Sequence, residues 1–132
     1  MNEEDRTKEL CRYRLEQANE ALTEAELLRD SKHFRGAINR AYYAMFYAIQ
    51  ALVALKKAET SKHTGAIAFF DRQFVKSDVF DKKFSKWLHR IFDLRQDSDY
   101  GDMFEPSEMQ CKEAVQHAKD FVQGIREYFE DE

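Results

Sequence analysis

One segment, residues 41–55, is apolar around nearly its whole circumference if it is helical, and this limits the folds open to the chain. It runs from Ala41 to Leu55 with Gln50 as its one amide side chain. An all-round apolar helix must be covered on most sides. The segment carries three tyrosines and is shorter than the roughly 20 residues that cross a membrane. We therefore predict a central bundle helix over about residues 33–57.

The shortage of turn-forming residues gives the fold class. The chain has 132 residues with four glycines and one proline, and 43% of its residues are hydrophobic. Few glycines and prolines favour helices of several turns over a sandwich or barrel, and this length suits one domain. The prediction is a single all-α domain over residues 1–132. We expect an antiparallel up-and-down bundle of four long helices plus one shorter helix.

Apolar periodicity and end signals place the other helices. The first is expected over residues 4–29. A shorter third helix would start at Thr60 or Ser61 and continue through Phe74. A fourth would run from Asp78 or Asp81 to Gly101. The last would follow Ser107, which can form a capping box with Gln110.

Charge is unevenly distributed along the chain. Residues 33–96 hold 12 basic and 5 acidic side chains, whereas residues 1–32 hold 6 and 9 and residues 97–132 hold 3 and 11. The basic middle could face an anionic partner, or it could pair with the acidic helices beside it, which is the interpretation we favour. A net charge of −4 argues against nonspecific nucleic-acid binding, so no DNA partner is expected.

Several classes of protein are disfavoured by what the sequence lacks. No apolar run is long enough for a membrane span, and the N-terminal segment is acidic, unlike a signal peptide. A cytoplasmic protein without membrane contact is expected. Cys11 and Cys111 lack a Cys-x-x-Cys spacing and are predicted to be reduced and buried. The histidines are scattered, so no metal or other cofactor is expected; they are His33, His63, His89 and His117.

The most informative polar cluster begins at Arg95. Arg95 falls on the apolar side of its helix, seven residues after Leu88 and four after Ile91. A charge at such a position needs a partner, and Asp99 follows one turn later. The pair is either a structural brace or part of an anion-binding site that includes Tyr100.

Other candidates lie on the two preceding helices. Arg40, Tyr43 and Tyr47 share a stripe on the central helix, which could stack a base or could be ordinary bundle packing. Lys62 and His63 stand at a predicted helix start, where His63 could face an anion or serve as a cap. His89 and Asp93 are one turn apart, and we predict an exposed pair between them.

Three runs of residues resemble the small prokaryotic HEPN-domain proteins over almost the whole chain. They are Ala37 to Tyr47, Ser61 to Gly65, and Leu94 to Tyr100. The resemblance implies a bundle of four to five helices, usually a homodimer. It also implies frequent association with a minimal nucleotidyltransferase, often as a toxin and antitoxin pair.

Many HEPN proteins are metal-independent ribonucleases with an arginine followed, after four to six residues, by a histidine. In that chemistry the histidine moves a proton and the arginine steadies phosphate charge. Arg95 matches the arginine, but the three positions allowed for histidine hold Tyr100, Gly101 and Asp102. Tyrosine, with a reference pKa near 10, is a poorer base than imidazole.

Two functions therefore remain open. The favoured one is a noncatalytic HEPN subunit that binds a nucleotidyltransferase and a nucleotide or RNA. The alternative is a ribonuclease toxin that uses Arg95 with a histidine from elsewhere, His63 being the first to test. The catalytic candidates are thus Arg95, His63 and Tyr100, and the candidates for phosphate or nucleotide binding are Arg95, Asp99, Tyr100, Arg40, Tyr43, Lys62 and His63.

Overall fold

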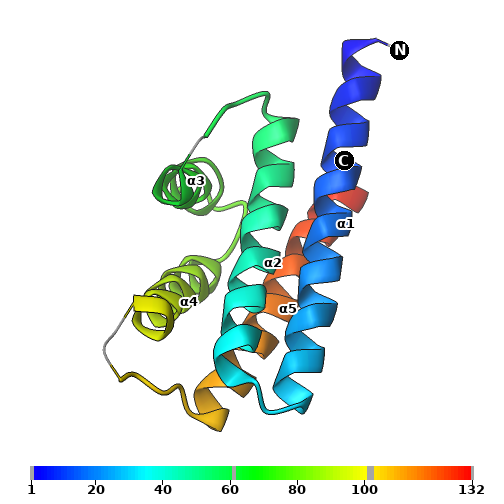
Figure 1. Cartoon of the computed structure of the whole chain (residues 1–132). Helices are drawn as coiled ribbons and strands as arrows, with labels where there is room; N and C mark the ends of the chain where they lie inside the picture. Colours follow the sequence, from blue (N-terminus) through cyan, green and yellow to red (C-terminus); the bar gives the residue numbers. More distant parts are fainter. Residues whose placement is uncertain (1, 61, 101–102, 132) are drawn as a thin grey trace.

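The computed structural model describes residues 2–60, 62–100 and 103–131, with the backbone alone for Tyr100. Within these ranges the regular elements are all helices (Figure 1), so the predicted all-α bundle is confirmed. The elements are α1 (Glu3–Asp30), α2 (Phe34–Leu55), α3 (His63–Phe70), the π-helix η1 (Asp71–Val75), α4 (Lys82–Tyr100) and α5 (Glu108–Glu130).

Helix α2 is the central element, as its all-round apolar sequence predicts. It contacts α1, α3, α4 and α5, and twelve of its 22 residues are buried. In Figure 1, α1 and α2 are seen from the side while α3 and α4 are seen nearly end-on, so the two pairs cross. Although α2 is strongly apolar, no helix in the described ranges is long and apolar enough to cross a membrane.

Small side chains line the contact between α1 and α2. Each side chain in this set is fully buried, and alanines on both helices allow a close approach; they are Ala18, Ala21, Ala25, Ala37, Ala41, Ala44 and Ala48. The thiol of Cys11 donates to the carbonyl of Ala51 at 3.4 Å. Cys11 and Cys111 are both free and buried, as predicted.

Two of the predicted helix starts are confirmed and one is wrong. Ser107 and Gln110 form the capping box of α5, with bonds of 3.0 and 2.9 Å. The carboxylate of Asp81 accepts from the backbone N–H of Lys83 at the start of α4. Thr60 does not cap α3, which has Lys62 as its N-cap; the Thr60 hydroxyl instead accepts from Gln50 of α2. The predictions for Ser61 and Gly101 fall outside the described residues.

The third helix ends differently from the prediction. The α-helix stops at Phe70, and residues 71–75 form the wider turn of η1. The Asp71 carboxylate there accepts from Ser85 at 2.7 Å and lies 2.6 Å from Nε2 of His89. The predicted pair of His89 with Asp93 is therefore wrong. A partner on an adjacent element is preferred to an exposed neighbour on the same helix, whose interaction is worth little.

The basic middle of the chain pairs in part with the acidic ends. Four ion pairs join the two regions across different helices or loops, namely Arg35 with Glu105, Arg40 with Glu24, Lys57 with Glu3, and Arg90 with Glu113. Other basic side chains of the middle are exposed and have no ion pair among the described residues, including Lys62, Lys76, Lys82 and Lys86. Pairing thus accounts for part of the excess charge.

One glycine is required by close packing between α4 and α5. A Cβ added at Gly124 would lie 2.6 Å from the Phe84 ring, which is itself packed against Phe80, Trp87 and Phe121. We expect Gly124→Ala to lower the free energy of unfolding by about 1–3 kcal/mol, because the ring cannot move freely. Denaturant unfolding followed by circular dichroism measures this change.

The matched control is Gly65→Ala in α3. A Cβ there would meet only the Thr60 Cβ, at an ordinary 3.8 Å. Alanine is the better helix former, so this variant should be unchanged or more stable by up to about 1 kcal/mol. Equal destabilisation of both variants would contradict the packing argument.

Candidate functional site

Arg95 lies where α4 meets the aromatic surface of α2, which is formed by Tyr42, Tyr43 and Phe46. Its helix buries Leu88 and Ile91 on the same side, so the side chain is carried inward and is only 15% exposed. The guanidinium carbon lies 5.1 Å from the ring centre of Tyr42 and 5.6 Å from that of Tyr43. A cation held over two aromatic faces is stabilised there despite partial loss of water.

The predicted ion pair between Arg95 and Asp99 is present. Nε of Arg95 lies 3.1 Å from Oδ2 of Asp99, and Asn39 on α2 donates to the same oxygen at 3.3 Å. The Nε–H bond of Arg95 is nevertheless not directed at any acceptor among the described residues. The charges are close, but the hydrogen-bonding capacity of the guanidinium is not used up.

His63 is brought to the same aromatic surface from α3. Its Nδ1 lies 2.6 Å from the Tyr42 hydroxyl, and its ring stacks on Phe46 with centres 4.2 Å apart. The edge of Tyr43 approaches it at 5.6 Å between ring centres. His63 and Arg95 therefore contact the same two rings, Tyr42 and Tyr43, from two different helices.

The electrostatics of this cluster keep both of its central titratable rings neutral at pH 7. Burial lowers the pKa of His63 below its usual value, and the nearby Arg95 charge lowers it further. Burial raises the pKa of Tyr42 well above its usual range, with Arg95 opposing part of the change. An imidazole is a side chain that can move protons near neutral pH, and a guanidinium beside it can stabilise charge on a phosphate.

The predicted stripe of Arg40, Tyr43 and Tyr47 lies beside the Arg95 and His63 cluster. Arg40 lies over Tyr43 at 5.4 Å and forms an ion pair with Glu24 of α1 at 3.2 Å, and Tyr43 is 5.9 Å from Tyr47 between ring centres. Nε of Arg40, like Nε of Arg95, has no hydrogen-bond acceptor in the described part of the chain. Lys62 precedes His63 as the exposed N-cap residue of α3.

The structure thus gathers most of the predicted candidates around one aromatic surface. Arg95, Asp99, His63, Arg40 and Tyr43 lie together, although the sequence offered them as separate groups. The side chain of Tyr100 lies outside the described residues.

Sequence reasoning missed three contributors, which are Tyr42, Asn39 and Phe46. Tyr42 was assigned only to the apolar run, yet a buried tyrosine hydroxyl needs a hydrogen-bonding partner. That requirement could have identified Tyr42 as a candidate site residue. The identity of the partner could not be found without the fold.

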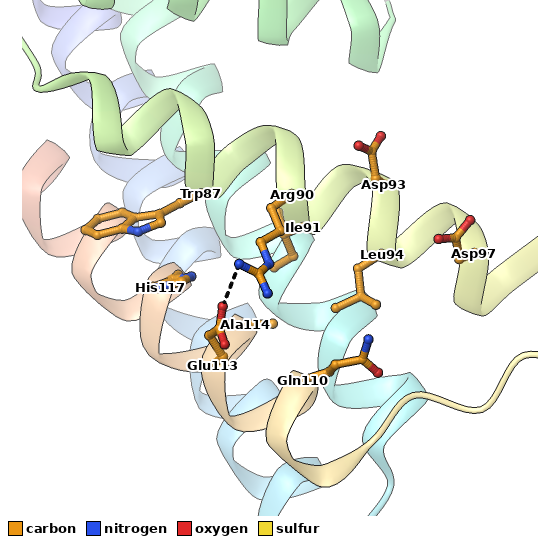
Figure 2. Close-up of a pocket in the computed structure, with 10 residues that line it drawn as sticks. All are labelled: Trp87, Arg90, Ile91, Asp93, Leu94, Asp97, Gln110, Glu113, Ala114 and His117. Carbon is orange, nitrogen blue, oxygen red and sulfur yellow. Dashed lines mark ion pairs between the residues drawn. The ribbon is translucent and has the colours of Figure 1, made fainter.

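A separate pocket of about 210 Å³ lies between α4 and α5, away from these residues. Figure 2 shows Trp87 above His117 and Arg90 reaching to Glu113, whereas Asp93 points away from α5. The rings of Trp87 and His117 stack at 4.9 Å, and the ion pair measures 3.1 Å. None of the predicted site residues lines this pocket, because Arg95 faces α2 instead.

Residue types that bind metal ions do not cluster in the described part of the chain. Across the described ranges, no group of three or more histidine, cysteine, aspartate or glutamate side chains converges. The described side chains of the site provide a guanidinium, an imidazole, a phenol, a carboxylate and aromatic faces.

The altered protonation of His63 can be tested directly. We expect the His63 pKa, followed by NMR, to lie below 6.5. In Arg95→Gln it should rise only part of the way back, because burial is the larger cause. A wild-type pKa at or above 6.5 would contradict this description of the site.

The same shift predicts how stability varies with pH. A lowered pKa in the folded state means that the unfolded chain binds more protons, so this contribution to stability is complete above pH 6.5. It is lost as the pH falls through the folded-state pKa. The free energy of unfolding should therefore fall less steeply on acidification in His63→Gln than in wild type, as measured by denaturant unfolding at several pH values.

Comparison with known proteins supports the resemblance seen in the sequence. Residues 11–128 match the HEPN domain family. A UPF0332 protein of Thermotoga maritima is 37% identical over 131 residues, covering 99% of this chain and 97% of the relative. Two Methanocaldococcus jannaschii proteins, each named "Putative toxin", are 31% and 26% identical; the alignments cover 85% and 86% of this chain and 83% and 78% of theirs. The chain belongs to the HEPN domain family.

Proposed function

We propose that this protein is a toxin-like, metal-independent ribonuclease whose site is formed by Arg95 and His63. The observation that carries the proposal is the shared contact of both side chains with Tyr42 and Tyr43. The missing histidine after Arg95 argued for a noncatalytic protein. The imidazole of His63, supplied by α3, weakens that argument. The two relatives named as toxins support the toxin-like assignment.

The chemistry needs a group that moves a proton and a group that stabilises charge on the phosphate, and this cluster contains both. The ribose 2′-oxygen attacks the adjacent phosphorus, the bond to the 5′-oxygen breaks, and a 2′,3′-cyclic phosphate remains. A proton leaves the 2′-hydroxyl and another reaches the 5′-oxygen. His63 would carry out one of these transfers and solvent water the other. Arg95 would stabilise the added negative charge on the phosphate oxygens.

Arg95 can accept a phosphate because its present partners leave donors free. The ion pair with Asp99 is formed at Nε, and that N–H is not directed at an acceptor among the described residues. Phosphate presents a fork of oxygens that suits the planar guanidinium. A phosphate would therefore compete with Asp99 for Arg95, or would bind to the guanidinium nitrogens that Asp99 leaves open.

The neighbouring stripe suits an unpaired base. Tyr43 and Tyr47 are partly exposed, and Arg40 already lies over the Tyr43 ring. Aromatic and guanidinium planes are the surfaces on which single-stranded bases stack. Single-stranded RNA is the substrate class that this arrangement favours, with Lys62 adding positive charge beside His63.

The second candidate is a noncatalytic HEPN subunit that binds a nucleotide or RNA together with a minimal nucleotidyltransferase. One observation favours it: Tyr42 occupies one nitrogen of His63, and Asp99 balances the charge of Arg95. A ligand could then be held without proton transfer. Both candidates use the same residues, so activity distinguishes them.

The deciding measurement is cleavage of single-stranded RNA in chelator by purified protein. We expect wild type to release 2′,3′-cyclic phosphate ends, and Arg95→Ala and His63→Ala each to lose at least about 100-fold in rate. A substrate with a 2′-deoxyribose at the cleaved position should remain intact.

The matched control variants remove an arginine and a histidine that lie outside the proposed site. Arg90→Ala removes an arginine of α4 that faces Glu113, and His117→Ala removes a histidine that stacks on Trp87. Both should cleave as wild type does. If folded wild-type protein leaves the RNA intact, the ribonuclease proposal is refuted. RNA or nucleotide binding that depends on Arg95 would then support the noncatalytic subunit.

We further propose a homodimer that places two such sites near each other, in keeping with the family. Multi-angle light scattering should give about twice the mass of the 15.7 kDa chain. A monomer at micromolar concentration would remove any mechanism that shares a cleft between subunits. The nucleotidyltransferase partner is tested by co-expression and co-purification with the product of an adjacent gene.

A further inference from the structure

Tyr42 connects the two halves of the site through different parts of one side chain. The residue is fully buried on α2. Its ring face takes the Arg95 guanidinium at 5.1 Å, and its hydroxyl meets Nδ1 of His63 at 2.6 Å. The two interactions fix the arginine and the histidine relative to one rigid ring.

The direction of the hydrogen bond follows from which groups can accept a proton. Burial keeps Tyr42 protonated, so its hydroxyl has one hydrogen to donate. The other neighbours of the ring are aromatic side chains and the Arg95 cation, and among the described residues the Tyr42 hydroxyl has a hydrogen bond to none of them. Nδ1 of His63 is the acceptor that remains in the described structure.

An imidazole that accepts at Nδ1 carries its single proton on Nε2 when it is neutral. We infer that Tyr42 is a positioning residue that holds His63 as the Nε2–H tautomer, with Nδ1 toward the core. Nε2 is then the one ring nitrogen left for a ligand, and in the resting protein it is a donor.

This inference refines the proposed function, on which its catalytic consequence rests. A neutral His63 with hydrogen on Nε2 donates a hydrogen bond to a phosphate oxygen. It transfers a proton to the leaving 5′-oxygen only after Nδ1 is protonated as well, because loss of the Nε2 proton from the neutral ring would leave an imidazolate anion. It cannot take the proton of a 2′-hydroxyl at Nε2 until the tautomer changes. Taking that proton would require the Tyr42 hydroxyl to rotate and accept from Nδ1–H.

The charged and titratable groups around His63 come from three helices. Tyr42 and Tyr43 approach from α2, Arg95 from α4, and Lys62 is its neighbour at the start of α3. Phe46 covers one face of the ring without charge. Tyr42 is the one among these to which the structure gives a hydrogen bond with the imidazole.

The test is the tautomer of His63, read from ring ¹⁵N and ¹³C chemical shifts at about pH 8, above the reference histidine pKa. Wild type should show the Nε2–H form. Tyr42→Phe keeps the ring but removes the donor, so the spectrum should move to a mixture of tautomers. Tyr43→Phe, which alters a neighbouring hydroxyl not hydrogen-bonded to His63 in the described structure, should leave the tautomer as in wild type.

These outcomes test the inference without a measurement of RNA cleavage. A wild-type Nδ1–H tautomer would overturn it, as would an unchanged tautomer in folded Tyr42→Phe. If Tyr42→Phe fails to fold, the wild-type spectrum can still overturn the inference by showing the Nδ1–H form.

The catalytic consequence is measured separately with single-stranded RNA. Tyr42→Phe should lower kcat at least about 10-fold and displace the histidine limb of the pH–rate profile, while KM changes little, because Tyr42 is buried away from the ligand. An unchanged pH profile would overturn the positioning role. A wild type that shows the Nε2–H tautomer but no cleavage would refute the ribonuclease and leave the tautomer assignment standing.

Discussion

The burial of α2 is the constraint on which the rest of this structure depends. A helix that is apolar on every side cannot be stable in water until neighbours cover it, and α1, α3, α4 and α5 all contact it. Its fully buried large side chains include Ile38, Tyr42, Met45, Ile49 and Leu52, and the four aliphatic ones are each worth roughly 1.5–3 kcal/mol on burial. Alanines on its α1 side let the backbones approach, whereas its aromatic side meets the shorter α3 and the crossing α4. The asymmetry of one helix therefore sets where the neighbours pack.

The candidate site is a consequence of that aromatic side. Tyr42, Tyr43 and Phe46 present ring faces and one hydroxyl, and polar groups from α3 and α4 are held against them. Arg95 gains a cation–π contact and His63 a hydrogen bond and a stacked ring. Partial burial between the helices and the nearby Arg95 charge both lower the pKa of His63 and so disfavour its protonated form. The core packing that stabilises the fold thus also sets the chemistry of the site.

Local features of the site could be predicted from the sequence, and distant ones could not. The Arg95 and Asp99 pair was predictable because residues four apart on a helix are neighbours by geometry. The capping box at Ser107 followed from spacing in the same way. His63 and Tyr42 lie 21 residues apart, and nothing in either segment shows that they meet. The error at His89 has the same origin: Asp93 was the nearest acid in sequence, but Asp71 was the nearest in space.

The sequence by itself determined the helical class, the central position of α2, most helix bounds and the identity of Arg95 as a charge in an apolar stripe. These properties depend on periodicity, end signals and composition, all of which act within a few residues. Only the tertiary structure decided that an imidazole from α3 reaches the ring that holds Arg95. It also decided that the π-helix η1 bonds to α4. Such contacts depend on how helices cross and which faces meet, and that is set by the packing of the whole core around α2.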